Sequence, residues 1–176
     1  MTVDQSLRLS SAALGAAGEY LVMSELLMRG YISALAPIGV PNIDILVTDR
    51  SGGTNFSMQV KTTLSRAKGK SRRLSRNNEA VRSEGLFYAF VGFGFDFRDP
   101  SRIYIIPSRA VACAVRDDHA AWLSGPGRGG SVRKDNDVRK FPPNHRQNYG
   151  NRPNPYDEKW IEPYLDRWDL LPSATS

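Results

Sequence analysis

The stretch PNIDILVTDRSGGTNFSMQVKTT, residues 41–63, predicts two short strands joined by a turn. Apolar and β-branched residues fill 43–49 and 55–62, and the paired glycines Gly52 and Gly53 between them suit a tight hairpin. With the turn centred on these glycines, Asp44 faces Lys61 across the hairpin and Leu46 faces Gln59. A shift of two residues in register would place Asp44 opposite Gln59 instead and would keep the same face.

The hairpin has one apolar and one polar face, because side chains alternate along a strand. The apolar face carries Phe56, Met58 and Val60. The polar face brings an acid, an amide and an amine (Asp44, Gln59 and Lys61) within about 5–8 Å of one another. From the pattern alone, these residues could also be a cross-strand ion pair on a solvated face, which would contribute little to stability.

The remaining chain predicts a mixed α/β fold. Residues 10–29 predict a helix with Ser10 or Ser11 as its N-cap and Gly30 as its stop. Further strands are expected at 31–37, 86–93 and 102–106, and further helices at 108–115 and 117–123. The continuous apolar run Leu86–Phe93 predicts a central strand buried on both faces. This order of elements predicts a mixed sheet flanked by helices.

The last third of the chain differs in composition. Residues 124–155 are rich in Gly, Pro, Asn and Arg and predict a long basic loop, and 156–171 predict a C-terminal helix. We therefore expect a core at 1–123 and, at 124–176, a loop-rich basic extension and helix that pack on the same domain. The single cysteine, Cys113, cannot form an internal disulfide, so a reducing, cytoplasmic setting is expected. The sequence has no apolar run long enough to span a membrane.

The positive charge is clustered. The formal net charge is +6, and most of the excess falls in one stretch from Lys61 to Arg82 and a second from Arg128 to Arg152. Clustered Lys and Arg favour a polyanionic partner such as a nucleic acid.

Three motifs together resemble the PD-(D/E)XK nuclease superfamily, which includes type II restriction enzymes and archaeal Holliday-junction resolvases. Glu19 lies in GAAGEYLVMSELLMRG, Asp44 in PNIDILV, and Gln59 and Lys61 in MQVKTT. The resemblance covers about residues 12–63 and implies a restriction-endonuclease-like fold. Two features depart from the family pattern: Pro41 precedes the acid by three positions, and Gln59 stands where most members have Asp or Glu. Some members, including certain homing endonucleases, carry Gln-x-Lys.

The resemblance implies metal-dependent hydrolysis of DNA phosphodiester bonds. Asp44 would be the principal Mg²⁺ ligand, Gln59 would ligate through its side-chain oxygen, and Glu19 would reach the metal directly or through water. Lys61 would orient or activate the attacking water and offset charge at phosphorus. Mn²⁺ is expected to substitute for Mg²⁺.

The basic stretch after Lys61 is expected to clamp the phosphates of double-stranded or branched DNA, although a solvated loop would have the same composition. The residues expected to contact nucleic acid are Thr62, Arg66, Lys68, Lys70, Arg72, Arg73 and Arg76. A homodimer is also compatible with the resemblance, since restriction-like nucleases often dimerise. Two alternatives stay open: a DNA-binding protein of the same fold that does not cleave, and an RNA-binding or assembly protein whose hairpin is only structural.

Overall fold

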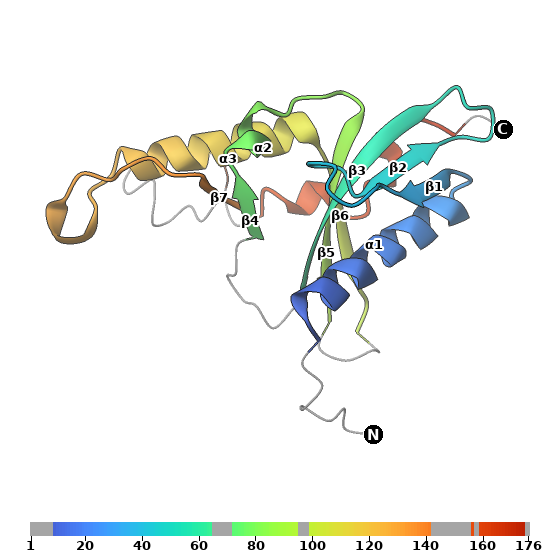
Figure 1. Cartoon of the computed structure of the whole chain (residues 1–176), viewed down its shortest axis with the longest axis horizontal. Coiled ribbons are helices and arrows are strands. Elements are labelled where there is room, and N and C mark those ends of the chain that lie inside the picture. Colours follow the sequence, from blue (N-terminus) through green and yellow to red (C-terminus); the bar gives the residue numbers. More distant parts are fainter. Residues whose placement is uncertain (1–8, 65–71, 95–98, 142–155, 157–158, 175–176) are drawn as a thin grey trace, which may run out of the picture.

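The computed structural model describes residues 9–64, 72–94, 99–141, 156 and 159–174 (Figure 1). Its α-helices are α1 (Ser11–Met28), α2 (Asn77–Ala80) and α3 (Ser108–Leu123). Its strands are β1 (Ile32–Leu35), β2 (Ile45–Thr48), β3 (Asn55–Leu64), β4 (Arg72–Ser75), β5 (Leu86–Phe93), β6 (Arg102–Pro107) and β7 (Val138–Phe141). No helix in these described ranges combines the length and apolar character needed to cross a bilayer.

Five strands form a mixed sheet in the order β1-β2-β3-β5-β6. Only β3 and β5 run parallel, and the other neighbours are antiparallel. A separate two-stranded antiparallel sheet joins β4 and β7. The fold class expected from the sequence, a mixed sheet flanked by helices, is confirmed.

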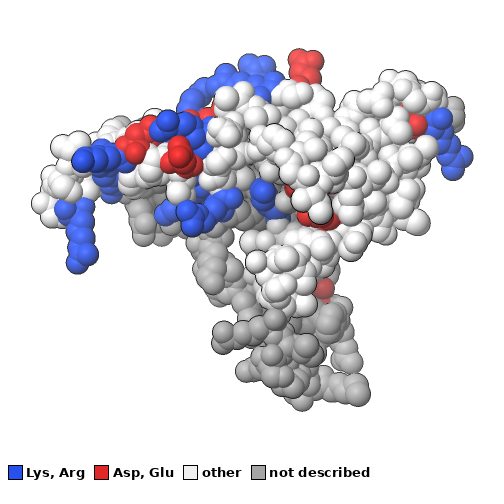
Figure 2. All heavy atoms as spheres, in the orientation of Figure 1, with Lys and Arg blue, Asp and Glu red and all other residues white. Residues whose placement is uncertain are grey.

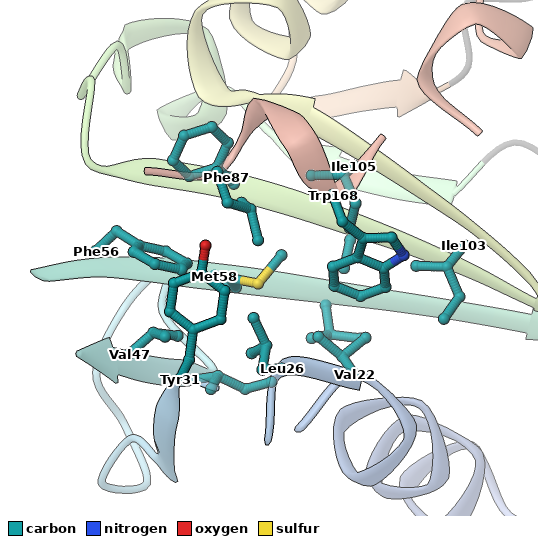
Figure 3. Packing of buried hydrophobic residues seen from close by; sticks show 14 of the residues in the cluster. Val22, Leu26, Tyr31, Val47, Phe56, Met58, Phe87, Ile103, Ile105 and Trp168 are labelled. Carbon is teal, nitrogen blue, oxygen red and sulfur yellow. The ribbon is translucent and has the colours of Figure 1, made fainter. Parts of the chain in front are cut away.

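Helices α1 and α3 cover opposite faces of the main sheet, each over its own hydrophobic cluster. Val22 and Leu26 of α1 pack on the even-numbered side chains of β3, such as Met58, and Trp168 closes this cluster (Figure 3). Val111 and Val115 of α3 belong to the second cluster. Its other buried members are Leu74, Leu86, Tyr88, Phe90, Tyr104, Ile106, Ala114, Phe141 and Ile161. Strand β5 contributes to both clusters, so the expectation of a central strand buried on both faces is confirmed.

The first helix begins and ends as its sequence predicts. The Ser10 hydroxyl accepts a hydrogen bond from the Ala13 amide at 3.1 Å, which satisfies one of the free N–H groups of the first turn. Gly30, at φ +87°, follows the last turn in a conformation that favours glycine. Within the helix, Gly18 is buried, and a Cβ atom there would lie 2.0 Å from the Thr62 hydroxyl oxygen. Helix α1 can therefore lie close against β3 only because residue 18 has no side chain.

The register of the hairpin differs from the one expected first. Ile45 pairs with Met58 and Thr48 with Asn55, a register that would continue from Asp44 toward Gln59 and not toward Lys61, but the pairing ends at Ile45, and the Asp44 amide donates to the Met58 carbonyl. The cause is the turn: the Asp49 carboxylate accepts hydrogen bonds from the Ser51 hydroxyl and the Gly53 amide, which makes a longer loop than a two-glycine turn. The expected pairing of Asp44 with Lys61 is wrong, and the register shifted by two residues is the correct one.

The expected C-terminal helix over 156–171 is also wrong. Two 3-10 helices, Glu162–Tyr164 and Trp168–Leu170, are found instead. Pro163 lacks the N–H that a continuing helix requires, and Asp166, at φ +52°, turns the chain back. The Asp166 amide then donates to the carbonyl of Ile103, so this segment adds to the edge of β6.

Two smaller expectations change. Helix α3 is unbroken from Ser108 to Leu123, without the interruption expected near residue 116. The two basic stretches, expected to be loops, contribute β4 and β7. The pairing of β4 with β7 buries Leu74 and Phe141 over Tyr88 and Phe90. An apolar residue in each basic stretch was the only sequence signal for this pairing. The division of the chain at residue 123 stays a prediction.

Candidate active site

Asp44 lies just before β2, at the point beyond which β3 has no partner strand on that side within the described residues and pairs with β5 alone. Its amide donates to the Met58 carbonyl at 2.9 Å, and its carboxylate oxygen Oδ2 accepts from the Val60 amide at 2.7 Å. The side chain of Asp44 thus occupies the position that the next strand residue would take. A peptide hydrogen bond therefore holds the carboxylate through its oxygen Oδ2.

Glu19 approaches the same place from α1. Gly18, packed on Thr62, brings the helix close to β3, and Glu19 is the next residue. Burial raises the pKa of the Glu19 carboxyl, the negative charge of Asp44 raises it further, and the positive charge of Lys61 lowers it. The structure therefore brings Glu19, Asp44 and Lys61 into one electrostatic environment, although α1 packs on the opposite face of the sheet from Gln59.

Gln59 lies on β3 between Met58 and Val60, the two residues whose backbone bonds Asp44, and is buried, at 6% exposure. Its carbonyl oxygen Oε1 accepts a hydrogen bond of 3.3 Å from the amide nitrogen of Asn78, which is itself 3% exposed. The same nitrogen bonds the Asn42 carbonyl oxygen at 3.1 Å and the Tyr88 hydroxyl at 2.8 Å. Burial raises the pKa of Tyr88, the bond from Asn78 lowers it, and the charge of Asp44 raises it.

The sequence analysis missed these three neighbours of Gln59. Asn78 lies in the basic stretch, where we considered only the cationic side chains. Tyr88 is the one hydroxyl-bearing residue of the apolar run LFYAF, and a polar tip in such a run is a signal that a buried partner exists. Asn42 precedes Asp44 by two residues and takes φ +62°, which Asn tolerates better than most residues.

The expected phosphate-binding residues do not share one setting. Arg73 is exposed, and Arg76 is exposed but ion-paired with Asp135 and Asp137. Thr62 is not placed with them, because its hydroxyl oxygen is buried against Gly18 without a hydrogen-bond partner. Arg72 is described only as part of β4, while Arg66, Lys68 and Lys70 lie outside the described residues.

The second basic stretch contains a structural arginine. Arg139 is 3% exposed and forms an ion pair with Glu79, with further bonds to the carbonyls of Asn136 and Val138. It is not available to a nucleic acid. On the face drawn in Figure 2, most Lys and Arg side chains gather on the side that carries α3, β4 and β7 in Figure 1, with Asp and Glu side chains among them. Part of the positive charge is therefore neutralised within the protein.

The donor set fits a hard divalent cation. Glu19 and Asp44 offer carboxylate oxygens, and Mg²⁺ is commonly held by one or two carboxylates while it keeps several waters. Within the described part of the chain, no group of three or more His, Cys, Asp or Glu residues could hold a metal ion. The candidate metal site has few acids because residue 59 is an amide and not a carboxylate.

No family model matches the chain, and no curated protein matches it in sequence. Solved structures do align with it, among them these three. A bacterial homing endonuclease aligns at 15% identity and a TM-score of 0.46, over 93% of this chain and 91% of that one. The Hjc Holliday junction resolvase of Archaeoglobus fulgidus aligns at 19% identity and a TM-score of 0.38, over 71% and 86%. A restriction endonuclease in complex with substrate DNA aligns at 15% identity and a TM-score of 0.44, over 78% and 65%.

The chain has an α/β fold, a mixed five-stranded sheet flanked by helices, as the sequence predicts. With identities of 19% or less and TM-scores of 0.46 or less, the three alignments are weak likenesses, and no property of those proteins is carried over to this chain. The Gln-x-Lys form of the site stays a prediction.

Proposed function

We propose that the protein is a metal-dependent DNA endonuclease that hydrolyses phosphodiester bonds. The observation that carries this proposal is the Asp44 carboxylate, held by the Val60 amide at 2.7 Å just before β2, with Glu19 of α1 near enough for the charges of Asp44 and Lys61 to act on its pKa. Two acids and one amine at the edge of a sheet match the needs of phosphate chemistry, which requires bound cations and a group that stabilises negative charge.

Each residue has a distinct task. Asp44, held by the Val60 amide, and Glu19, delivered by α1, supply the oxygens that would hold Mg²⁺. The bound cation would supply Lewis-acid polarisation of the phosphate and a more acidic water. Lys61 lies on the same face of β3 as Gln59, two residues further on, where its ammonium group can hold the attacking water and offset charge that builds at phosphorus.

DNA is the proposed substrate, double-stranded or branched. Arg73 is exposed on β4. At the end of β4, Ser75 bonds Asn78, and Asn78 in turn bonds Gln59, so β4 is connected to the candidate site. Contacts from such cations to phosphates are independent of sequence and weaken steeply as salt is raised. A homodimer is compatible with cutting both strands and is checked by the mass of the protein in solution.

A second candidate is a DNA-binding protein that does not cleave. Gln59 favours it, because an amide there leaves the site with one negative charge fewer than a third acid would. Such a protein would bind DNA in a salt-sensitive way, with or without divalent cation.

Cleavage assays separate the two candidates. Supercoiled plasmid and a four-way DNA junction are incubated with the protein in Mg²⁺, Mn²⁺ or EDTA. We expect metal-dependent nicking that is lost in Asp44→Asn, Glu19→Gln and Lys61→Met. The matched control is Glu25→Gln, which changes an acid on the same helix that pairs with Arg29. Equal nicking by the Asp44→Asn variant and the unchanged protein would refute the endonuclease proposal, and binding without any nicking would support the second candidate.

A further inference from the structure

The orientation of the Gln59 side-chain amide follows from hydrogen bonds that begin at Ser75. The Ser75 main-chain N–H can only donate, and it bonds the Asn78 oxygen Oδ1 at 2.8 Å. The Ser75 hydroxyl donates to the same oxygen at 3.0 Å. The opposite end of the Asn78 side chain must therefore be its NH₂ group, which cannot accept, and it donates to Tyr88, Asn42 and, at 3.3 Å, Gln59.

The reverse orientation of Gln59 is unfavourable. It would set the NH₂ group of Gln59 against the NH₂ group of Asn78, two donors facing each other. Both residues are buried, at 6% and 3% exposure, so water could not readily relieve the mismatch. Gln59 consequently turns its oxygen Oε1 toward Asn78, at 3.3 Å, and its nitrogen Nε2 away from it.

The nitrogen Nε2 of Gln59 is not among the buried, unpaired side-chain atoms of the described residues. Asp44 lies near the backbone of Gln59, since its amide bonds the Met58 carbonyl and its carboxylate accepts from the Val60 amide, on either side of residue 59. The end of the Gln59 amide that points away from Asn78 is thus a hydrogen-bond donor, and it belongs to the strand residue between the two that bind Asp44.

We propose that Gln59 donates a hydrogen bond from Nε2 to a phosphate oxygen of the substrate rather than ligating the cation, and that Asn78 is the positioning residue that fixes this orientation. This inference rests on the endonuclease function proposed above. It assigns the metal to Glu19 and Asp44 and replaces the ligand role expected for Gln59 from the sequence. A fixed donor aimed at a phosphate oxygen stabilises the charge that develops there, and needs no third acid.

The first test measures Mn²⁺ binding to the DNA-free protein by titration calorimetry. Asp44→Asn should weaken binding by about tenfold or more, because loss of even an indirect partner of a metal ligand typically costs that much. Gln59→Met, which keeps the length of the side chain and removes its polar atoms, should change the affinity by less than about twofold. The same variant should slow plasmid nicking by roughly a hundredfold, the effect of losing one fixed donor.

The second test reverses the amide. In Asn78→Asp, residue 78 has only acceptors, so Gln59 must turn its NH₂ toward it and its oxygen toward the cation site. We expect Mn²⁺ affinity to rise and to become sensitive to Gln59→Met in the double variant. A purely structural role for Asn78, or a simple effect of the added charge, would not create this dependence, which a double-mutant cycle isolates.

The outcomes are distinguishable. If Gln59→Met alone weakens Mn²⁺ binding as much as Asp44→Asn does, Gln59 is a ligand and the inference is overturned while the endonuclease proposal survives. If the unchanged protein shows no Mn²⁺ binding that depends on Asp44, both the inference about Gln59 and the endonuclease proposal fail. Should a variant not fold, the side-chain amide signal of Gln59 in the unchanged protein is followed by NMR. A larger shift with a DNA duplex in EDTA than with Mg²⁺ alone supports the inference, and the opposite overturns it.

Discussion

Replacing Gly18 by alanine tests whether the close contact between α1 and β3 delivers Glu19 to the site. The new Cβ atom would lie 2.0 Å from the Thr62 hydroxyl oxygen and 3.0 Å from the Thr62 Cβ and Cγ2 atoms. Rotating the Thr62 side chain cannot relieve the contact with Cβ, so the helix must move. Overpacking of this kind costs about 1–3 kcal/mol, while alanine in place of glycine in a helix gains about 1 kcal/mol.

Gly15 is the matched control, because it lies in the same helix and an added Cβ atom there would meet nothing within 4 Å. The propensity gain is common to Gly15→Ala and Gly18→Ala, so the difference between them isolates the packing cost of about 1–3 kcal/mol. For a chain of this size that difference corresponds to about 2–12 °C in Tm. Thermal unfolding followed by circular dichroism measures it directly.

The same pair of variants reports on the site. Gly18→Ala should also lower metal-dependent nicking, since Glu19 moves with the helix, and Thr62→Ala in the same chain should restore part of both the stability and the nicking. Gly15→Ala should leave the nicking unchanged. If Gly18→Ala and Gly15→Ala unfold within about 0.5 kcal/mol of each other, the helix has room to spare and the close-contact explanation is refuted.

Three further results are expected. Glu19→Gln should raise Tm at neutral pH, because the fold raises the pKa of this carboxyl and so disfavours its charged form. This gain in Tm should vanish as the pH falls to the ordinary carboxyl pKa of 4.5, and a gain that persists in acid would contradict the explanation. Mg²⁺ at a hundred times its Kd should stabilise the unchanged protein by about 2.7 kcal/mol and have much less effect on Asp44→Asn, as measured by thermal unfolding. Arg139→Met should cost about 3–5 kcal/mol in urea unfolding, because it leaves Glu79 without its partner, whereas the exposed Arg73→Met should cost under about 0.5 kcal/mol and weaken DNA binding in a filter assay.

Local patterns were enough to predict the elements that form the site. Helix α1 has a serine cap and a terminal glycine, and the alternation along β3 places Gln59 and Lys61 on one face; both are short-range signals that survive in the fold. These features depend on residues close together in the chain.

Long-range contacts could not be predicted in the same way. The hairpin register depends on the Asp49 carboxylate folding back on Gly53, and a glycine pair alone suggested a shorter turn. The bond from Asn78 to Gln59 joins a four-residue helix in the basic stretch to β3, and no periodicity announces such a contact. The pairing of β4 with β7 joins segments more than sixty residues apart in sequence, each too short to be recognised as a strand.

The placement of Trp168 has a consequence for how the chain reaches its native state. The indole closes the cluster over α1, Leu171 joins it, and the Tyr31 hydroxyl donates to the Pro172 carbonyl at 2.6 Å. Helix α1 is therefore covered by residues that are synthesised much later than the helix itself. Until residues 168–172 have left the ribosome, the apolar side of α1 stays open to water, so folding completes after synthesis of these residues, and a nascent chain halted before them should depend on chaperones.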